Sequence, residues 1–353
     1  MQQFCLNRND TSLLKTIGIF LIVFSHSLGY PAWYVQGISL NLLDGYTDYI
    51  AHFMMYAYVP MFAFLTGYTY NLKQDLSWKY ILKKIIGFML DYYLIFLAIL
   101  SLACIFCNYK PSLFQIGREL YPIAAKLMMF AWYVPFYCEA MIVLRYLGLS
   151  IKQYGVRKSI YICIIIFLIL EVLIGFFKSI GLRGEVLVIA LQAFKRNIPF
   201  VIMGFFFAQE QCFNKMTQLL RKKYKSKNIG FIIVLFFLMI ASLFNYKILG
   251  LQSGIIYTPI YIFCISSLKI GDNNFIRNIT EFLSRHSANI WFLHCIFFSE
   301  ITRETFQYIV FIPSHNPLII VCWIILICSL TSIIIMPLQE NLKKLVLGSL
   351  ELS

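Results

Sequence analysis

Apolar stretches of about 20 residues recur along the whole chain, which is the length that an α-helix needs to cross a membrane. Hydrophobic side chains make up 60% of the 353 residues and charged ones only 13%. Such values lie outside the range of soluble globular domains. The sequence therefore predicts an all-α, polytopic integral membrane protein.

Ten transmembrane helices are expected, and residues 1–353 are expected to form one transmembrane domain without an extracytoplasmic soluble domain. The first span is too long, and lacks a small-residue cleavage site, to be a removed signal peptide. Lys195, Arg196 and Asn197 interrupt the sixth span, so residues 183–196 are alternatively an interfacial or re-entrant piece. The predicted spans are 12–31, 49–71, 82–106, 122–147, 160–177, 188–209, 229–248, 252–269, 287–311 and 317–338.

The charge distribution sets the predicted orientation. The net charge of +14 is compatible with nucleic-acid binding, but the lysines and arginines concentrate in alternate loops. With both termini cytoplasmic, 21 of the 30 lie on the inner side, as the positive-inside rule expects. We therefore expect no nucleic-acid partner, and anionic lipid headgroups of the bilayer as the default partners of these cations.

The segment Leu14 to Leu28, LKTIGIFLIVFSHSL, combines an apolar helix with two ionisable side chains. Lys15 and His26 are eleven residues apart, so on a helix they differ by about 20° in direction and about 16 Å in height. Ionisable groups inside a membrane usually face a protein interior or a watery cavity. The alternative is a snorkelling lysine and a packing histidine that forms a structural hydrogen bond.

Several other polar residues lie in or near predicted spans. Asp48 precedes His52 by one helical turn, so the two side chains can approach each other. Glu171 lies in the middle of LILEVLI, and Glu139 follows Trp132 by seven residues on the same helix face. Each of these carboxylates either lines a site or forms a structural hydrogen bond.

Two further features complete the set of candidates. Asp91 lies nearer the cytoplasm, and His294 lies in an otherwise apolar helix, where it lines a cavity or packs in the core. Of the ten cysteines, only Cys104 and Cys107 form a CxxC pair, and this pair has no partner ligands. No metal site and no redox role are expected.

LLKTIGIFLIVFSHS resembles the first-helix signature of the membrane acyltransferase-3 family, in which a basic residue is followed by ten residues and a histidine. In this chain lysine (Lys15) stands where arginine is commoner, Thr66 where serine is usual, and Ala131 where a histidine often precedes the tryptophan. Thr66 and Gly67 also suit a close helix contact. The other similar segments follow in the family's order: FAFLTGYTY (62–70), the basic cluster Lys79, Lys83 and Lys84, AWYVPFY (131–137), KRNIPFVIMGFFFA (195–208) and NIWFLHCIFF (289–298).

The resemblance implies transfer of an acetyl or other short acyl group from cytoplasmic acyl-CoA to a hydroxyl of an envelope polysaccharide or lipid-linked sugar. His26 is then the base, because an imidazole suits proton abstraction near neutral pH. A carboxylate such as Glu139 or Asp48 is expected to orient it. Acetyl-CoA is a donor substrate, and no permanently bound cofactor is expected.

The donor's phosphates need cations at the inner mouth of the site, and Lys15, Lys83 and Lys84 are available there. Trp132 either flanks the expected acyl path or belongs to an interfacial aromatic belt. Arg196 and Asn197 place a cation and an amide near a CoA phosphate or the acceptor, or alternatively snorkel to the interface. Asn197, His294, Glu171 and His52 are the other candidates for lining the cavity. Longer relatives fuse an extracytoplasmic hydrolase-like domain that completes the transfer. Here either the membrane domain acylates the acceptor directly or a separate extracytoplasmic transferase is a partner.

Two other interpretations stay open at the level of the sequence. A polytopic transporter or flippase of a lipid or small metabolite would also use buried histidine, aspartate and glutamate, and a broken span would suit it. The chain shows no internal repeat, which argues against this class. An inactive family member that acts as a sensor or assembly partner is the third reading. Consumption of acyl-CoA distinguishes the enzyme from both.

Overall fold

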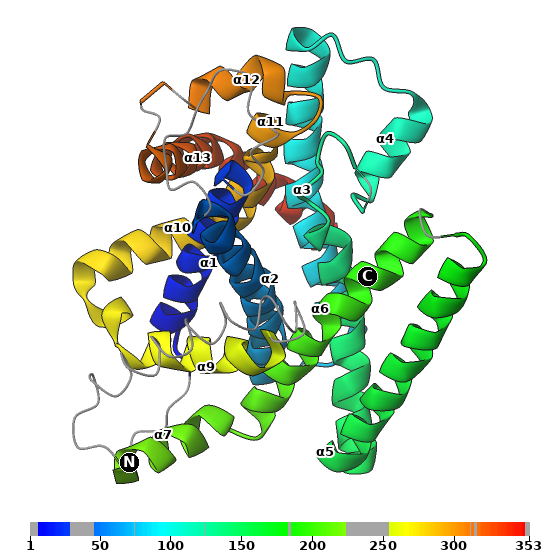
Figure 1. Cartoon of the computed structure of the whole chain (residues 1–353), viewed down its shortest axis with the longest axis vertical. Coiled ribbons are helices and arrows are strands. Elements are labelled where there is room, and N and C mark those ends of the chain that lie inside the picture. The colour runs from blue at the N-terminus through cyan, green and yellow to red at the C-terminus, as the bar shows by residue number, and fades with distance from the viewer. Residues whose placement is uncertain are drawn as a thin grey trace. The chain divides into compact units, whose positions relative to one another are not determined.

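The computed structural model describes residues 6–28, 46–73, 75–123, 125–182, 185–223, 254–310, 312–313 and 316–349, and the side chains of residues 46–57 lie outside this part. Every regular element within these ranges is helical, which confirms the predicted all-α class (Figure 1). The elements are α1 Arg8–Leu28, α2 Tyr46–Lys73, α3 Trp78–Phe106, α4 Leu113–Leu120, α5 Tyr133–Ser179, α6 Val186–Gln209, α7 Cys212–Lys223, α9 Gly254–Ser267, the 3-10 turn η3 Ile270–Asp272, α10 Asn274–Leu293, α11 Cys295–Phe298, α12 Arg303–Val310 and α13 Pro317–Ser349.

Four of the described helices are long and apolar enough to cross a membrane. They are α3, α5, α6 and residues Leu318–Gly348 of α13. The protein is thus a multi-pass membrane protein by composition and helix length. The count of ten spans and the cytoplasmic position of both termini stay predictions, and the predicted span 229–248 lies outside the described residues.

Helix α5 contains a sharp turn that divides it into two arms, and the ribbon doubles back there (Figure 1). Gly155 has φ 79° and ψ 168°, a conformation that residues with a Cβ rarely adopt. On either side of the turn the hydroxyls of Ser150 and Ser159 lie 2.9 Å apart, so the chain closes on itself. The two arms contain most of the predicted fourth and fifth spans, with the turn between them.

The predicted span 287–311 is not one continuous helix. It consists of the end of α10, the short α11, a turn and α12. Side-chain hydroxyls replace helical hydrogen bonds at the break: the Ser299 hydroxyl accepts from the Thr302 N–H at 3.1 Å, and the Thr302 hydroxyl donates to the Ile296 carbonyl at 2.5 Å. Serine and threonine side chains compete with backbone groups for hydrogen bonds in this way. The break was not predicted, because the segment as a whole is apolar and resembles one continuous span.

Helix α6 is continuous through Lys195, Arg196 and Asn197. The polar side chains do not break the helix, and the interfacial or re-entrant alternative for residues 183–196 stays a prediction. Only residues 183 and 184, which precede the helix, lie outside the described part.

The helices group into two compact units, and the first combines most of α1 with α2, the second half of α6, α7, α9 and most of α10. Its core is aromatic: Phe64, Phe213 and Phe263 are fully buried. A Cβ on Gly67 would collide with the Val201 carbonyl, and one on Gly204 with the Phe64 carbonyl. This reciprocal close approach of α2 and α6 matches the helix contact expected at Gly67.

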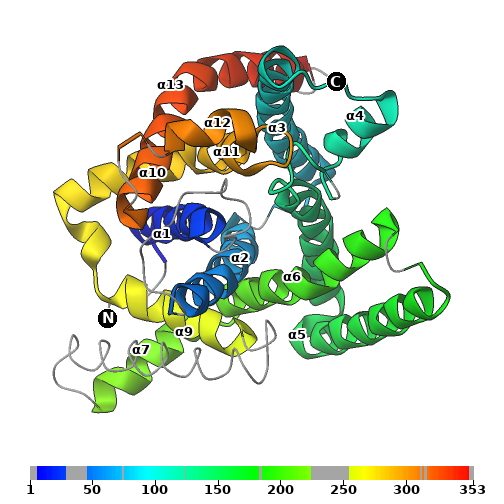
Figure 2. The same cartoon turned by 45° about the horizontal axis from the view of Figure 1, so that its top comes forward.

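The second unit contains the end of α1, α3, α4, α5, the start of α6, the end of α10, α11, α12 and α13. In it α3 and α13 lie side by side (Figure 2) and are joined by an ion pair, since Lys343 Nζ lies 2.5 Å from an Asp91 oxygen. The Asn289 amide of α10 donates to Ser332 and Gln339 of α13, at 2.8 Å each. These contacts hold the end of α10 in the second unit.

Candidate functional site

Two histidines from opposite ends of the chain meet inside the second unit. Nδ1 of His26, near the end of α1, lies 2.7 Å from Nε2 of His294, at the break between α10 and α11. His294 is fully buried and His26 is only 6% exposed. At this distance one ring must donate a proton to the other, because a neutral imidazole has one N–H donor and one acceptor nitrogen. The pair therefore acts as one hydrogen-bonded unit.

An aromatic ring covers the pair. The Phe130 ring stacks on His26 with centroids 3.8 Å apart, and the two imidazoles are nearly parallel, inclined by 7°. The Trp291 indole N–H donates to the Phe130 carbonyl at 3.0 Å, and the Trp291 ring lies 4.8 Å from that of Tyr133. Trp291 and His294 are three residues apart, so one turn of α10 positions both the histidine and the residue that holds Phe130.

A buried carboxylate anchors the segment that leads to Phe130. Glu119, at the end of α4, is 3% exposed. Its Oε1 accepts the backbone N–H groups of Lys126 and Leu127 at 2.7 and 2.8 Å, and its Oε2 accepts that of Met128 at 2.9 Å. The Tyr92 hydroxyl donates to the Glu119 carbonyl at 2.5 Å. Charge-assisted hydrogen bonds of this kind are stronger than neutral ones, so Glu119 orders the approach to the site.

Sequence reasoning did not single out Glu119. A glutamate in the last turn of a short helix, Leu113–Leu120, is usually a solvated surface charge. The only hint is that its segment is followed by an irregular stretch whose backbone N–H groups need acceptors. No periodicity indicates which side chain supplies them.

The described carboxylates that were expected to orient His26 have other partners. Glu139 accepts from the Tyr121 hydroxyl at 2.8 Å. Glu171 pairs with Lys195, and Asp91 pairs with Lys343. The backbone of Asp48 and His52 belongs to α2, but their side chains lie outside the described part. His294 forms the hydrogen bond with His26 that was expected of a carboxylate.

The cations expected near acyl-CoA lie on three helices. Helix α1 runs unbroken from Arg8 to Leu28, so Lys15 and His26 share one helix as predicted. Lys83 and Lys84 are exposed on α3, where the Lys84 ammonium lies 5.8 Å from the Tyr80 ring. Arg196 is exposed on α6, and Lys15 is half-buried.

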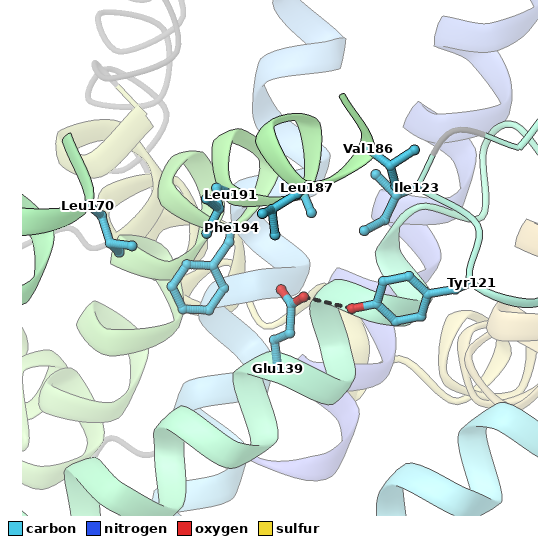
Figure 3. Close-up of a pocket in the computed structure, with 9 residues that line it drawn as sticks. Tyr121, Ile123, Glu139, Leu170, Val186, Leu187, Leu191 and Phe194 are labelled. Carbon is cyan, nitrogen blue, oxygen red and sulfur yellow. Dashed lines mark hydrogen bonds between the residues drawn. The ribbon is translucent and has the colours of Figure 1, made fainter. Parts of the chain in front are cut away.

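The remaining candidates are placed by α5 and α6. Trp132 directly precedes α5, half-buried, with its ring 6.0 Å from that of Tyr133. Asn197 is buried in α6. Glu139 borders a cavity of about 490 Å³, lined mainly by apolar side chains of α5 and α6 (Figure 3). Within the described ranges, no group of three histidine, cysteine or acidic side chains is placed to hold a metal ion.

The comparison with protein families gives one finding. A family model described as an acyltransferase domain matches residues 9–336. No curated protein and no solved structure matches the chain.

Proposed function

The chain belongs to the acyltransferase-3 family, and from this premise we propose that it is a membrane O-acyltransferase that acts on a cell-envelope carbohydrate. It moves an acetyl or other short acyl group from cytoplasmic acyl-CoA to a hydroxyl of a polysaccharide or lipid-linked sugar. The observation that supports this most directly is the buried contact between His26 and His294. A buried imidazole whose second nitrogen is held by another side chain has the arrangement of a general base.

In the proposed reaction, His26 donates its Nδ1–H to Nε2 of His294, which directs its Nε2 to the acceptor. Nε2 takes the hydroxyl proton while the sugar oxygen attacks the thioester carbonyl. The C–S bond breaks, the acyl ester forms, and the thiolate of CoA leaves and takes up the proton. His294 stabilises the transient imidazolium through the 2.7 Å hydrogen bond, as the carboxylate does in a Ser-His-Asp triad.

The donor enters from the cytoplasmic side in this proposal. Lys15, Lys83 and Lys84 attract the phosphates of acyl-CoA, although lysine binds phosphate as a point charge without the fork of arginine. The half-buried Trp132 borders the acyl path, and Arg196 with Asn197 supports either CoA or the acceptor. The proposed topology retains ten spans with both termini cytoplasmic in the plasma membrane.

The test is acyl transfer in proteoliposomes of the full chain, supplied with labelled acetyl-CoA and an envelope glycan fraction. We expect stoichiometric release of CoA and labelling of glycan, both lost in His26→Gln at unchanged folding. Transport without consumption of acyl-CoA would overturn the proposal in favour of the transporter. Activity that appears only after an extracytoplasmic fraction is added would support the version with a separate transferase partner.

A further inference from the structure

The cavity that Glu139 borders lies apart from the residues that contact His26, within the second unit. It is framed by Glu139 on the first arm of α5, Leu170 on the second arm, the start of α6 and the segment that includes Tyr121 (Figure 3). Its volume of about 490 Å³ falls in the range of small-molecule sites. Apart from Glu139, none of the residues that line it was predicted to take part in acyl transfer.

The walls of the cavity are almost wholly apolar. Leu187, Leu191 and Phe194 line it from α6, and Leu170 faces them from α5 (Figure 3). Leu187, at the edge, is 61% exposed, so the cavity is accessible from the side, where a membrane would supply a chain. An apolar cavity that opens laterally suits the hydrocarbon part of an amphiphile.

One wall is polar, and its charge selects the head of that amphiphile. Glu139 contacts the Tyr121 hydroxyl, and no lysine or arginine among the described side chains forms an ion pair with it. The neighbouring Glu171 is paired with Lys195, which ties the second arm of α5 to α6 beside the cavity. A carboxylate accepts hydrogen bonds from hydroxyls and repels an anionic group.

We propose that the cavity between Glu139, Leu170 and Leu187 binds a neutral glycolipid, with its chain against α6 and its sugar hydroxyls at Glu139 and Tyr121. This deepens the proposed function and rests on it, because the cavity is then the docking site of the lipid-linked acceptor, from which its sugar moves to His26 for acyl transfer. In the predicted topology, residues 121–123 and 186–194 begin the fourth and sixth spans on the outer side. The cavity therefore faces the side from which an envelope acceptor arrives.

The binding test uses decyl glucoside with a photoreactive diazirine in its chain, in phosphatidylcholine nanodiscs with the full-length protein. We expect labelling of residues 186–194 that unlabelled decyl glucoside competes away. Leu187→Trp fills the cavity and should lower labelling about tenfold, which corresponds to about 1.4 kcal/mol. Leu173→Trp is the matched control, since Leu173 is exposed on the same arm of α5 but does not line the cavity, and it should label like wild type.

The charge test uses decyl phosphate with the same diazirine. Wild type should label weakly with it, and Glu139→Gln should label more strongly because the repelling charge is gone. Equal labelling of wild type by both probes, or equal labelling of Leu187→Trp and wild type by decyl glucoside, would overturn the site.

A separate activity arm supplies labelled acetyl-CoA with either decyl glucoside or free glucose as acceptor. Preferential acylation of decyl glucoside, lowered in Leu187→Trp but kept in Leu173→Trp, supports the acceptor role. Acylation of glucose alone overturns that role. If neither acceptor nor the envelope glycan is acylated but competed labelling persists, the binding site stands and the proposed acyltransferase function falls.

Discussion

Two buried polar clusters of the second unit lie at the end of helix α10 and directly after it, and their chemistry differs. In the amide cluster, Asn289 and Gln339 exchange hydrogen bonds of 2.8 and 3.0 Å, and Ser332 accepts a third. Five residues later, His294 forms a hydrogen bond with His26 at 2.7 Å. The amide cluster contains no group that can take up or release a proton in a reaction, whereas an imidazole can do both. One cluster therefore holds helices together, whereas the other is suited to move protons.

The largest expected effect is on activity at His26. His26→Gln should lower acyl transfer by about 10² to 10⁴-fold, the usual contribution of a general base. Its midpoint of thermal unfolding should stay near wild type, because glutamine still offers a polar group to His294. Single-turnover CoA release measures the loss. An unfolding midpoint that falls as steeply as the activity would erase the distinction between the clusters.

His294 is expected to act through His26, with a smaller effect. His294→Phe keeps an aromatic ring but removes the hydrogen bond to the imidazolium, a charged hydrogen bond worth about 1.5–3 kcal/mol. We expect kcat to fall about 10- to 100-fold, with KM for acyl-CoA unchanged.

The double variant His26→Gln/His294→Phe separates the two possibilities. It should be no slower than His26→Gln alone, because the two histidines act as a unit. If the loss of activity in the double variant equals the product of the two single losses, His294 has an independent role.

The amide cluster should respond in stability instead. Asn289→Leu leaves the buried amide of Gln339 and the hydroxyl of Ser332 without their shared partner, which costs about 1–3 kcal/mol. Thermal unfolding in detergent measures this loss, and activity per folded molecule should match wild type. A loss of turnover in the folded fraction would place the amide cluster with the site after all.

The smallest expected effect tests whether the segment before Phe130 belongs to the histidine pair. Glu119→Gln offers only one acceptor oxygen to three backbone N–H groups, so stability should fall by about 1–2 kcal/mol. Hydrogen exchange at residues 126–128 should speed up, and turnover should fall with it as Phe130 loosens over His26.

Glu300→Gln is the matched control for Glu119. Glu300 pairs with Lys126 at 3.5 Å, but both side chains are more than half exposed, and such surface ion pairs contribute little. If the two variants behave alike, the three hydrogen bonds of Glu119 are not what orders the segment.

Part of the site could be predicted from the sequence. An imidazole inside an apolar helix is costly unless it has a partner, and this reasoning singled out His26 and His294 separately. Their contact could not be predicted, because 268 residues separate them and no local pattern encodes which helices meet. For the same reason, the sequence left Glu139, Glu171 and Asp91 as possible partners that orient His26. In the structure Glu139 accepts a hydrogen bond from Tyr121, and Glu171 and Asp91 pair with lysines.

The sequence by itself determined the all-α class, the apolar helices and the short list of buried ionisable residues. These follow from hydrophobic composition and helix length, which act locally along the chain. The tertiary structure decided which imidazole faces which, where α10 breaks and which carboxylate anchors the segment before Phe130. Those outcomes depend on which helices pack together and on which backbone N–H groups then need an acceptor. Both are set only when the helices assemble.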